Sequence, residues 1–362
     1  MPMNKILLAC LLFIQFASFG QQKKYNVIAY YTGNGETIRQ YPVHQLTHII
    51  YSFLALHNDS LAFRNEKQEQ TIRQLVQLKK DYPQLKIMVS IGGWGGCAPC
   101  SDLFASADHR NNFAKTVVDL FKQYNIDGLD LDWEYPAIEG YPGHTFSPSD
   151  KSNFTELVKA LRKEMGNNYL LTFAAGGFTK YLEQSIDWDA VMPLVDFVNL
   201  MTYDLVNGYS TVTGHHTPLA DYRSGQESTQ KCVNWLLSNK TDPGKLIIGA
   251  AFYARIWKDV DRINHGLYQN GKYLQDLAYK NFDSYFNKHP GFKSFWDDSA
   301  KASWKYNPIE KLFSTFDDER SINEKTTFIR NNKLGGIMFW ELTLDRPSRG
   351  LIGVITKGLD KW

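Results

Sequence analysis

Neither sign of charge dominates the sequence, and it contains no long basic run. Forty Lys and Arg residues stand against 38 Asp and Glu residues, which gives a formal net charge of +2. A protein that follows a nucleic-acid backbone needs clustered basic side chains to neutralise the phosphates. We therefore expect no nucleic-acid partner.

Long apolar runs are also missing, except for one at the start. Residues 1–20 carry Lys5, then a short apolar stretch and small residues before the polar QQKK. This pattern is typical of a secretory signal peptide, and it predicts a secreted or periplasmic protein with no membrane span after cleavage at Gly20. LLAC, ending at Cys10, only faintly resembles a lipoprotein signal, because most of the apolar run follows that cysteine. Lipid anchoring is not expected.

Cysteine is scarce, with four residues in all. A zinc site would need four ligands, and no second C-x-x-C accompanies the CAPC stretch of Cys97 and Cys100. A redox or metal function of CAPC is therefore the weaker interpretation, and we expect a structural disulfide between these two residues in an oxidising compartment. Cys232, in the apolar CVNWLL, is expected to be a buried thiol. No metal or other cofactor is predicted.

The G-x-G-x-x-G fingerprint of a dinucleotide-binding sheet is absent. Instead, apolar, β-branched and aromatic runs alternate with helix-like segments. One such segment ends at Tyr124, and another, 321–331, begins with Ser321 as a possible cap and Glu324 three residues later. The eight expected strands are 25–31, 46–53, 85–93, 126–133, 169–177, 195–204, 245–253 and 334–340. Eight strands with helical crossovers predict an α/β fold of the (β/α)8 TIM-barrel type.

One connection is far longer than a single helix requires. About eighty residues separate the seventh and eighth expected strands, and residues 256–306 hold twelve aromatic residues in 51. Such a stretch can form a small core of its own. We expect a barrel of residues 21–257 and 306–362, with residues 258–305 inserted as a subdomain.

The segment DGLDLDWEYP, residues 127–136, places four acids within eight positions. Strand alternation points Asp130, Asp132 and Glu134 to one face, whereas Asp127 does not share that face and is interpreted as structural. A half-exposed antiparallel strand would explain the acids, but parallel strands are covered on both faces. We expect the acids to line the barrel interior, with Glu134 at the carboxyl-terminal mouth.

Crowded carboxylates resist ionising together, so one of them keeps a proton near neutral pH. A proton donor at a barrel mouth suits the cleavage of a glycosidic bond. A Mg²⁺ or Ca²⁺ site is the competing interpretation. However, no His or acid cluster elsewhere in the sequence completes a ligand shell, and the histidines of GHHTP, His215 and His216, are expected to be loop residues.

These motifs together resemble those of glycoside hydrolase family 18 chitinases. DGLDLDWE fits that family's D-x-x-D-x-D-x-E signature, which is highly specific. The shorter and weaker motifs are SIGG at 90–93, MTYD at 201–204, FYAR at 252–255 and GGIMFW at 335–340. The resemblance spans nearly the whole chain after residue 20. It implies that the insertion between strands seven and eight is the α+β subdomain of one branch of the family.

The resemblance implies a role for each matching residue. Glu134 would be the general acid and later base, Asp132 would orient and stabilise the substrate acetamide, and Asp130 would be its inner charge partner, with Tyr203 beside the reacting sugar. Trp340 would be the flat floor under that sugar. The other expected substrate-binding residues are Met201, Asp204, Tyr253, Arg255, Tyr30, Phe53 and Trp94.

The function that the resemblance implies is hydrolysis of β-1,4 linkages between N-acetylglucosamine units of chitin or chito-oligosaccharides. The reaction would retain configuration and use the substrate's own N-acetyl group. An endo-β-N-acetylglucosaminidase acting on N-glycans would use the same acids. A sugar-binding lectin on the same barrel is a further alternative, although such proteins typically lose the final acid. We expect a monomer.

Two features depart from the family pattern. CAPC after GGWGG is not among its core motifs, so this loop is expected to shape the cleft in its own way. No Ser/Thr/Pro linker leads to a carbohydrate-binding module, which argues against efficient attack on crystalline polymer.

Overall fold

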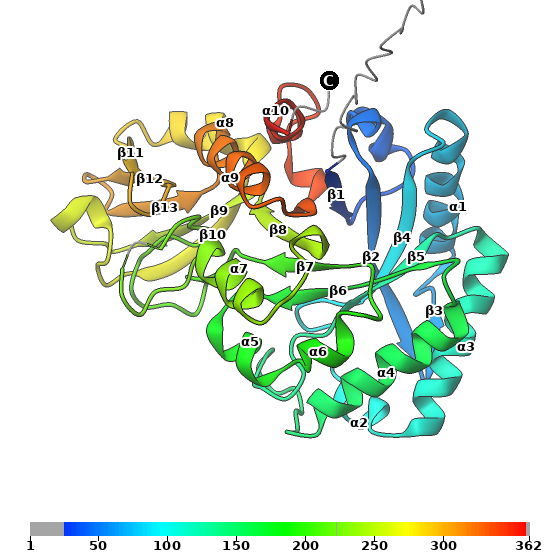
Figure 1. Cartoon of the computed structure of the whole chain (residues 1–362). Helices are drawn as coiled ribbons and strands as arrows, with labels where there is room; N and C mark the ends of the chain where they lie inside the picture. Colours follow the sequence, from blue (N-terminus) through cyan, green and yellow to red (C-terminus); the bar gives the residue numbers. More distant parts are fainter. Residues whose placement is uncertain (1–24, 222, 360–362) are drawn as a thin grey trace, which may run out of the picture.

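Eight parallel strands close into a barrel (Figure 1). The computed structural model describes residues 25–221 and 223–359, so the predicted signal peptide and Cys10 lie outside the described residues. The first strand pairs with both the second and the last, which closes the ring. The strands are β1 Asn26–Tyr31, β2 His48–His57, β4 Lys86–Gly92, β5 Gly128–Asp132, β6 Leu170–Gly176, β7 Phe197–Met201, β8 Leu246–Ala251 and β14 Gly336–Trp340. Each overlaps one of the eight predicted runs, although β2 continues four residues beyond the predicted end at Phe53, and the predicted TIM barrel is confirmed. A short strand, β3 Ser60–Ala62, pairs antiparallel with the end of β2.

Helices cover the outside of the barrel (Figure 1). The α-helices of the described residues are α1 Glu66–Asp81, α2 Cys100–Phe104, α3 Ala107–Tyr124, α4 Asp150–Met165, α5 Thr179–Gln184, α6 Trp188–Val191, α7 Thr229–Ser238, α8 Phe282–Lys288, α9 Glu319–Asn331 and α10 Leu351–Gly358, and of these α8 belongs to the insertion described below. None of the helices in the described part of the chain combines the length and apolar character that a membrane crossing requires.

The start of α9 differs from the prediction. Asp318 caps this helix by accepting a hydrogen bond from the Ser321 amide, and the Ser321 hydroxyl accepts one from the Asp318 amide in return. The predicted cap at Ser321 with Glu324 is therefore wrong. The capping box begins three residues earlier, because Asp318 caps as well as serine does and Ser321 takes the place that Glu or Gln usually fills.

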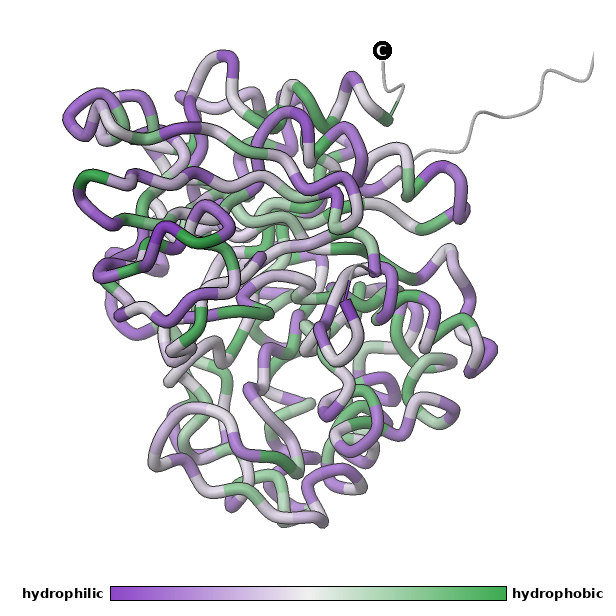
Figure 2. The backbone as a smooth tube through the Cα atoms, turned by 90° about the vertical axis from the view of Figure 1, so that its left-hand side faces the viewer, coloured by the Kyte–Doolittle hydropathy of each residue, from purple (hydrophilic) through white to green (hydrophobic). Residues whose placement is uncertain are grey.

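The strands bury different residues on their two faces. Leu131 and Trp133 point outward from β5 and pack under the helices, whereas the barrel interior holds side chains such as Ile28, Met88 and Met338. Figure 2 shows hydrophilic segments at the outer loops and less hydrophilic strands inside. The polar side chains of β5 are therefore enclosed by the barrel.

The predicted insertion is a separate antiparallel sheet beside the barrel mouth (Figure 1). Its core is aromatic, with Trp257, Trp304, Tyr306 and Phe313 buried together. The strands are β9 Tyr253–Lys258, β10 Lys272–Ala278, β11 Lys293–Asp297, β12 Ala302–Asn307 and β13 Leu312–Phe316, in the order β10-β9-β13-β12-β11, with α8 between β10 and β11. The sheet extends beyond residues 258–305 at both ends. Its first strand in the chain, β9, begins before this range and pairs with its last strand, β13, which lies after it.

Candidate active site

Strand β5 carries the acids toward the carboxyl-terminal mouth of the barrel. Asp130 is fully buried, Asp132 is 4% exposed, and Glu134, two residues beyond the end of the strand, is half-buried. Asp127 lies at the opposite end, where its Oδ2 accepts a hydrogen bond from the Ile87 amide and pairs with Lys79 Nζ at 3.0 Å. Its predicted structural role is thus explained by contacts remote from the mouth.

Asp130 is fixed by four hydrogen bonds from four other strands. Its Oδ2 accepts from the Tyr30 and Ser90 hydroxyls, each at 2.9 Å. Its Oδ1 accepts from Thr172 Oγ1 at 2.7 Å and Asn199 Nδ2 at 3.1 Å. Burial raises the pKa of Asp130, and these hydrogen bonds partly offset the rise. Asp130 therefore serves as a fixed inner support for the acids above it.

The pKa values of Asp132 and Glu134 are both raised above their ordinary values. Burial raises the pKa of Asp132 well above its ordinary value, and the charges of Glu134 and Asp130 add to the effect. Its Oδ1 is buried without a protein hydrogen-bond partner. Burial also raises the pKa of Glu134 to about 7, with a contribution from the charge of Asp204 and an opposing hydrogen bond from Tyr135. Glu134 can thus hold a transferable proton near neutral pH.

Backbone forms the wall beside these acids, at the end of β4. A Cβ atom on Gly92 would lie 2.0 Å from the backbone oxygen of Asp132, and one on Gly93 would lie 2.4 Å from the Phe53 ring. Both glycines also have positive φ angles, +101° and +77°. The prediction that the small residues of SIGG serve the crowded fold near the acids therefore has a steric basis.

Three of the predicted aromatic residues come together at the mouth. Trp340, at the end of β14, is half-buried and stacks on Phe53 with ring centroids 5.6 Å apart and planes 18° apart. Tyr30 lies 5.9 Å from the Trp340 ring, but it is only 1% exposed and its hydroxyl is occupied by Asp130. The structure thus gives Tyr30 a supporting place rather than the predicted place on the cleft surface.

Trp94 lies farther out, after β4, and is 46% exposed. Its ring is 6.4 Å from that of Tyr135, the residue next to Glu134. Trp94 is therefore available for contact with a ligand that reaches the acid.

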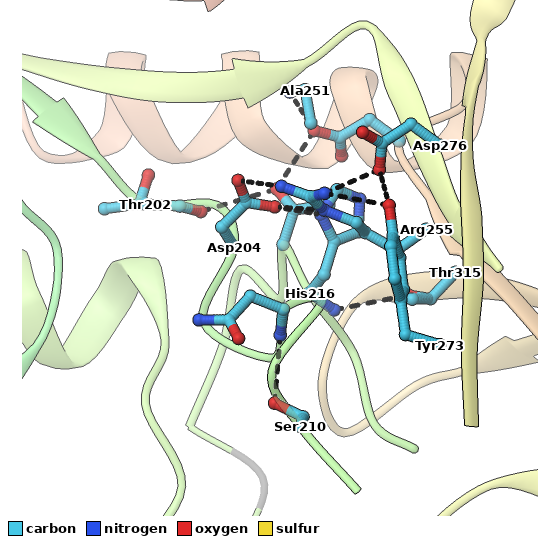
Figure 3. Close-up of polar contacts among 12 residues, drawn as sticks. Thr202, Asp204, Ser210, His216, Ala251, Arg255, Tyr273, Asp276 and Thr315 are labelled. Carbon is cyan, nitrogen blue, oxygen red and sulfur yellow. Dashed lines mark hydrogen bonds and ion pairs between the residues drawn. The ribbon is translucent and has the colours of Figure 1, made fainter. Parts of the chain in front are cut away.

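The motif MTYD begins with the last residue of strand β7, and its later residues contact strand β9 of the inserted sheet. Met201 and Tyr203 are each 9% exposed, and the Tyr203 ring lies 6.4 Å from the ring of Tyr253 on β9. Arg255, also on β9, holds Asp204 through two ion-pair contacts, Nε to Oδ1 at 2.8 Å and Nη2 to Oδ2 at 2.6 Å (Figure 3). The five predicted residues of this group are thus brought together.

The sequence did not reveal the other partners of Arg255. Its Nη1 donates to Asp276 Oδ1 at 2.6 Å and to the Tyr273 hydroxyl at 3.2 Å, both on β10 of the inserted sheet (Figure 3). Neither residue lies in a recognisable motif, since antiparallel pairing of β9 and β10 brings them to Arg255. Much of the hydrogen-bonding capacity predicted to serve sugar oxygens is therefore used within the protein.

His216 is a further neighbour that the sequence did not reveal. It is a loop residue, as predicted, but it is fully buried, and its Nδ1 lies 3.5 Å from Asp204 Oδ1. Burial would raise the pKa of Asp204, yet the nearby His216 and the hydrogen bonds from Arg255 hold this pKa well below its ordinary range. Burial lowers the pKa of His216. Among the described residues, no three His, Cys, Asp or Glu side chains are grouped to hold a metal ion.

The cysteines lie as predicted. Cys97 and Cys100 form a disulfide, and Cys232 is a free, buried thiol in α7.

Comparison with known proteins identifies the family. Residues 26–345 match the model of glycosyl hydrolases family 18. The chain belongs to this family. Chitinase A1 of Niallia circulans is 35% identical to this family 18 protein over 300 residues, which make up 76% of this chain and 43% of that protein.

Solved structures of family 18 proteins are also similar to this chain. A family 18 N-acetylglucosaminidase from Paenibacillus barengoltzii has 34% identity and a TM-score of 0.83, and the match covers 93% of this chain and all of that one. The multi-modular chitinase ChiW from a Paenibacillus strain has 31% identity and a TM-score of 0.86, over 92% of this chain and 42% of that one. The chain thus spans less than half the length of two of these three relatives.

Proposed function

We propose that this family 18 protein is a chitinase that hydrolyses β-1,4 linkages between N-acetylglucosamine units of chitin or chito-oligosaccharides. The observation that carries the proposal is Glu134 at the barrel mouth, with a pKa raised to about 7, next to the buried Asp132. The names of similar proteins, a chitinase from Niallia and a chitinase from Paenibacillus, support the choice of substrate.

In the proposed reaction, the nucleophile comes from the substrate. Glu134 donates its proton to the glycosidic oxygen while the acetamide oxygen of the same substrate attacks the anomeric carbon. The leaving sugar departs as an alcohol, and a cyclic oxazolinium ion remains, with Asp132 and Tyr203 beside it. The Glu134 carboxylate then takes a proton from water as that water attacks the anomeric carbon. Two inversions give net retention.

The state of the nearby carboxylates supports this route over a protein nucleophile. Asp130 is held by four hydrogen bonds inside the barrel, and Asp204 is held by Arg255. Asp132 has a buried oxygen without a protein partner, and this oxygen could accept the acetamide N–H. A single acid and a single acceptor suit a mechanism in which the substrate closes its own ring.

Partially N-acetylated chitosan tests the proposal. Random acetylation offers both sugars to the same enzyme, and only N-acetylglucosamine can supply the acetamide. We expect almost every new reducing end to carry an N-acetyl group. If sequencing of the products finds glucosamine at new reducing ends about as often as in the polymer, the nucleophile is not the substrate and the roles given to Asp132 and Tyr203 fail.

A second candidate is an N-acetylglucosaminidase that releases single sugars. The 34% identity to the Paenibacillus barengoltzii enzyme over its whole length favours this possibility. Digestion of chitohexaose over time separates the two functions. A chitinase should produce dimers and trimers early, whereas an N-acetylglucosaminidase should release monomer from the first time point.

We also propose that the protein acts outside the cytoplasm. The signal-like pattern of residues 1–20 supports secretion, and the Cys97–Cys100 disulfide suits an oxidising compartment. Mass spectrometry of protein recovered from culture medium or periplasm should give a mature chain that starts at Gln21.

A further inference from the structure

An exposed aromatic face continues outward from the catalytic acid. Trp94 contacts Tyr135, and it also contacts two tyrosines from other loops, Tyr141 at 5.6 Å and Tyr209 at 6.1 Å between ring centroids. Trp94, Tyr141 and Tyr209 are 46%, 38% and 66% exposed. Flat apolar rings with this much free surface suit the faces of sugar units.

The disulfide follows directly after the turn that carries Trp94. The Gly96 amide donates to Gly93 O at 2.9 Å, and the Cys100 amide donates to Cys97 O at 3.1 Å. The backbone is packed so closely that a Cβ atom on Gly96 would lie 1.9 Å from Gly92 O. The Cys97–Cys100 bond thus links the Trp94 turn to the first residue of helix α2.

Helix α2 has only five residues, and tertiary contacts anchor it. Phe104 is 1% exposed and packs against Trp133, which is next to Glu134 in the sequence. Ser101 Oγ donates to Asp150 Oδ1 at 2.8 Å, and Asp150 is fully buried.

Asp150 connects this helix to the loop that carries Tyr141. Its Oδ2 accepts hydrogen bonds from the amides of Ser147 at 2.7 Å and Ala137 at 3.4 Å, one at each end of that loop. The loop also passes close to the acid, since a Cβ atom on Gly140 would lie 2.2 Å from Glu134 O. A continuous path of contacts therefore joins the disulfide, through Ser101 and Asp150, to Tyr141.

From these contacts we infer that the Cys97–Cys100 disulfide and the Ser101–Asp150 hydrogen bond are positioning elements for substrate specificity. They hold Trp94 and Tyr141 at the spacing that grips sugar units beyond the one that reacts. The inference rests on the proposed chitinase function. It assigns CAPC and Asp150 to recognition of chain length and leaves the chemical step to Glu134.

The test compares kinetics with and without the disulfide. For the double variant Cys97→Ala with Cys100→Ala, we expect the KM for chitohexaose to rise about tenfold, while kcat changes less than about twofold. Cys232→Ala is the matched control, because it removes a buried cysteine outside this path, and its KM should equal that of the wild type. If the folded double variant has the wild-type KM for chitohexaose, the inference is overturned.

A second variant, at Asp150, tests the inference independently of the cysteines. For Asp150→Asn, which keeps the shape but weakens the bonds from Ser101 and Ser147, the KM for chitohexaose should rise in the same way and kcat should again be nearly unchanged. Hydrogen exchange in residues 93–104 and 137–150 should accelerate together in both variants. Acceleration of 93–104 alone would mean that the two loops are not coupled and would overturn the inference. If the wild type itself fails to cleave chitohexaose, the proposed function fails instead, whatever the exchange shows.

Discussion

The chemistry proposed at the residue scale depends on different surroundings for similar acids. Asp130 has its oxygens occupied by four donors, Asp204 is paired with Arg255, and Asp132 has an oxygen without a protein partner. Only Glu134 is half-exposed at the mouth with a pKa near neutrality. Four carboxylates thus have distinct states because their neighbours differ.

Replacement of the acid tests this division directly. For Glu134→Gln, we expect turnover of a chromogenic chitobioside to fall by about 1,000-fold or more, because the amide has no transferable proton. Binding of chitohexaose, measured by calorimetry, should survive because the amide retains the shape of the side chain. Turnover within tenfold of the wild type would show that Glu134 is not the acid.

The pH profile should report the same group. Because Glu134 must be protonated to act, kcat/KM should decline as the pH rises through about 7.

The free energy of unfolding should also depend on the protonation of Glu134. The folded protein binds this proton more tightly than the unfolded chain does, so the contribution of Glu134 to the free energy of unfolding falls as the pH rises from the ordinary carboxyl range to about 7. Rates across the range and urea unfolding of the wild type and Glu134→Gln check both effects. A rate that is level to about pH 9 contradicts the assignment.

At the scale of elements, a buried ion pair joins α9 to strand β8 and to the loop that carries Thr217. Lys325 Nζ lies 2.6 Å from Asp317 Oδ2, and both side chains are fully buried. The lysine also donates to Thr217 Oγ1 at 2.6 Å and to Gly249 O at 3.2 Å, and Asp317 accepts from the Ala251 amide. This pair therefore fixes helix, loop and strand β8 at one point.

We predict that Lys325→Met lowers the free energy of unfolding by about 3–5 kcal/mol, because it leaves Asp317 buried and unpaired. Lys159→Met is the matched control. Lys159 pairs with Glu156 on the surface, where both side chains are about half exposed, and its loss should have an effect of about 1 kcal/mol or less. Adding Asp317→Asn to Lys325→Met should recover part of the loss. Equal effects of the two lysine substitutions in urea unfolding would contradict this account.

The sequence predicted features that depend on residues close together in the chain, and it missed those that depend on residues far apart. Alternation along one strand was sufficient to place Asp130, Asp132 and Glu134 on one face, and hydrophobic runs were sufficient for the barrel. The partners of Asp130 come from four other strands, and the unpredicted partners of Arg255, Asp276 and Tyr273, come from β10. No local pattern encodes such pairings. The burial of His216 beside Asp204 was also decided by tertiary contacts. The cap at Asp318 is local, but its partner is Ser321 and not the usual Glu or Gln, so the prediction missed it. Local periodicity was thus enough to predict the acids. The residues that shift their pKa values or hold them in place could be found only from the fold.

For the whole molecule, the inserted sheet is part of the site's surroundings. It supplies Tyr253 and Arg255 from β9, and Asp276 and Tyr273 from β10, to the group around Asp204. The first and last strands of the insertion pair directly, with Trp257 opposite Phe313. The outer part of the sheet can therefore be removed while these two strands remain a hairpin.

We predict that replacing residues 259–311 by an Asn-Gly turn leaves a folded barrel. Trp257 and Phe313 should be changed to threonine in the same variant, because removal of Trp304 and Tyr306 leaves both without the rest of their aromatic core. Activity on chitohexaose should fall more than activity on chitobiosides, since Arg255 loses Asp276 and Tyr273. Asp276→Asn in the full chain is the control, because it weakens one Arg255 contact while the rest of the insertion stays in place. Equal losses of activity on both substrates would mean that the insertion does not contribute to binding of the longer oligosaccharide.

The glycine wall at the end of β4 has a consequence for adaptation. Where backbone forms the surface of a site, there is no side chain to exchange, and any replacement of Gly92 would displace Asp132 itself. On this side of the site, variation in selectivity is therefore expected from the loop beyond the end of β4, where side chains can be exchanged. The neighbouring CAPC turn is the nearest such place, and a library built there can alter preference without touching the chemistry.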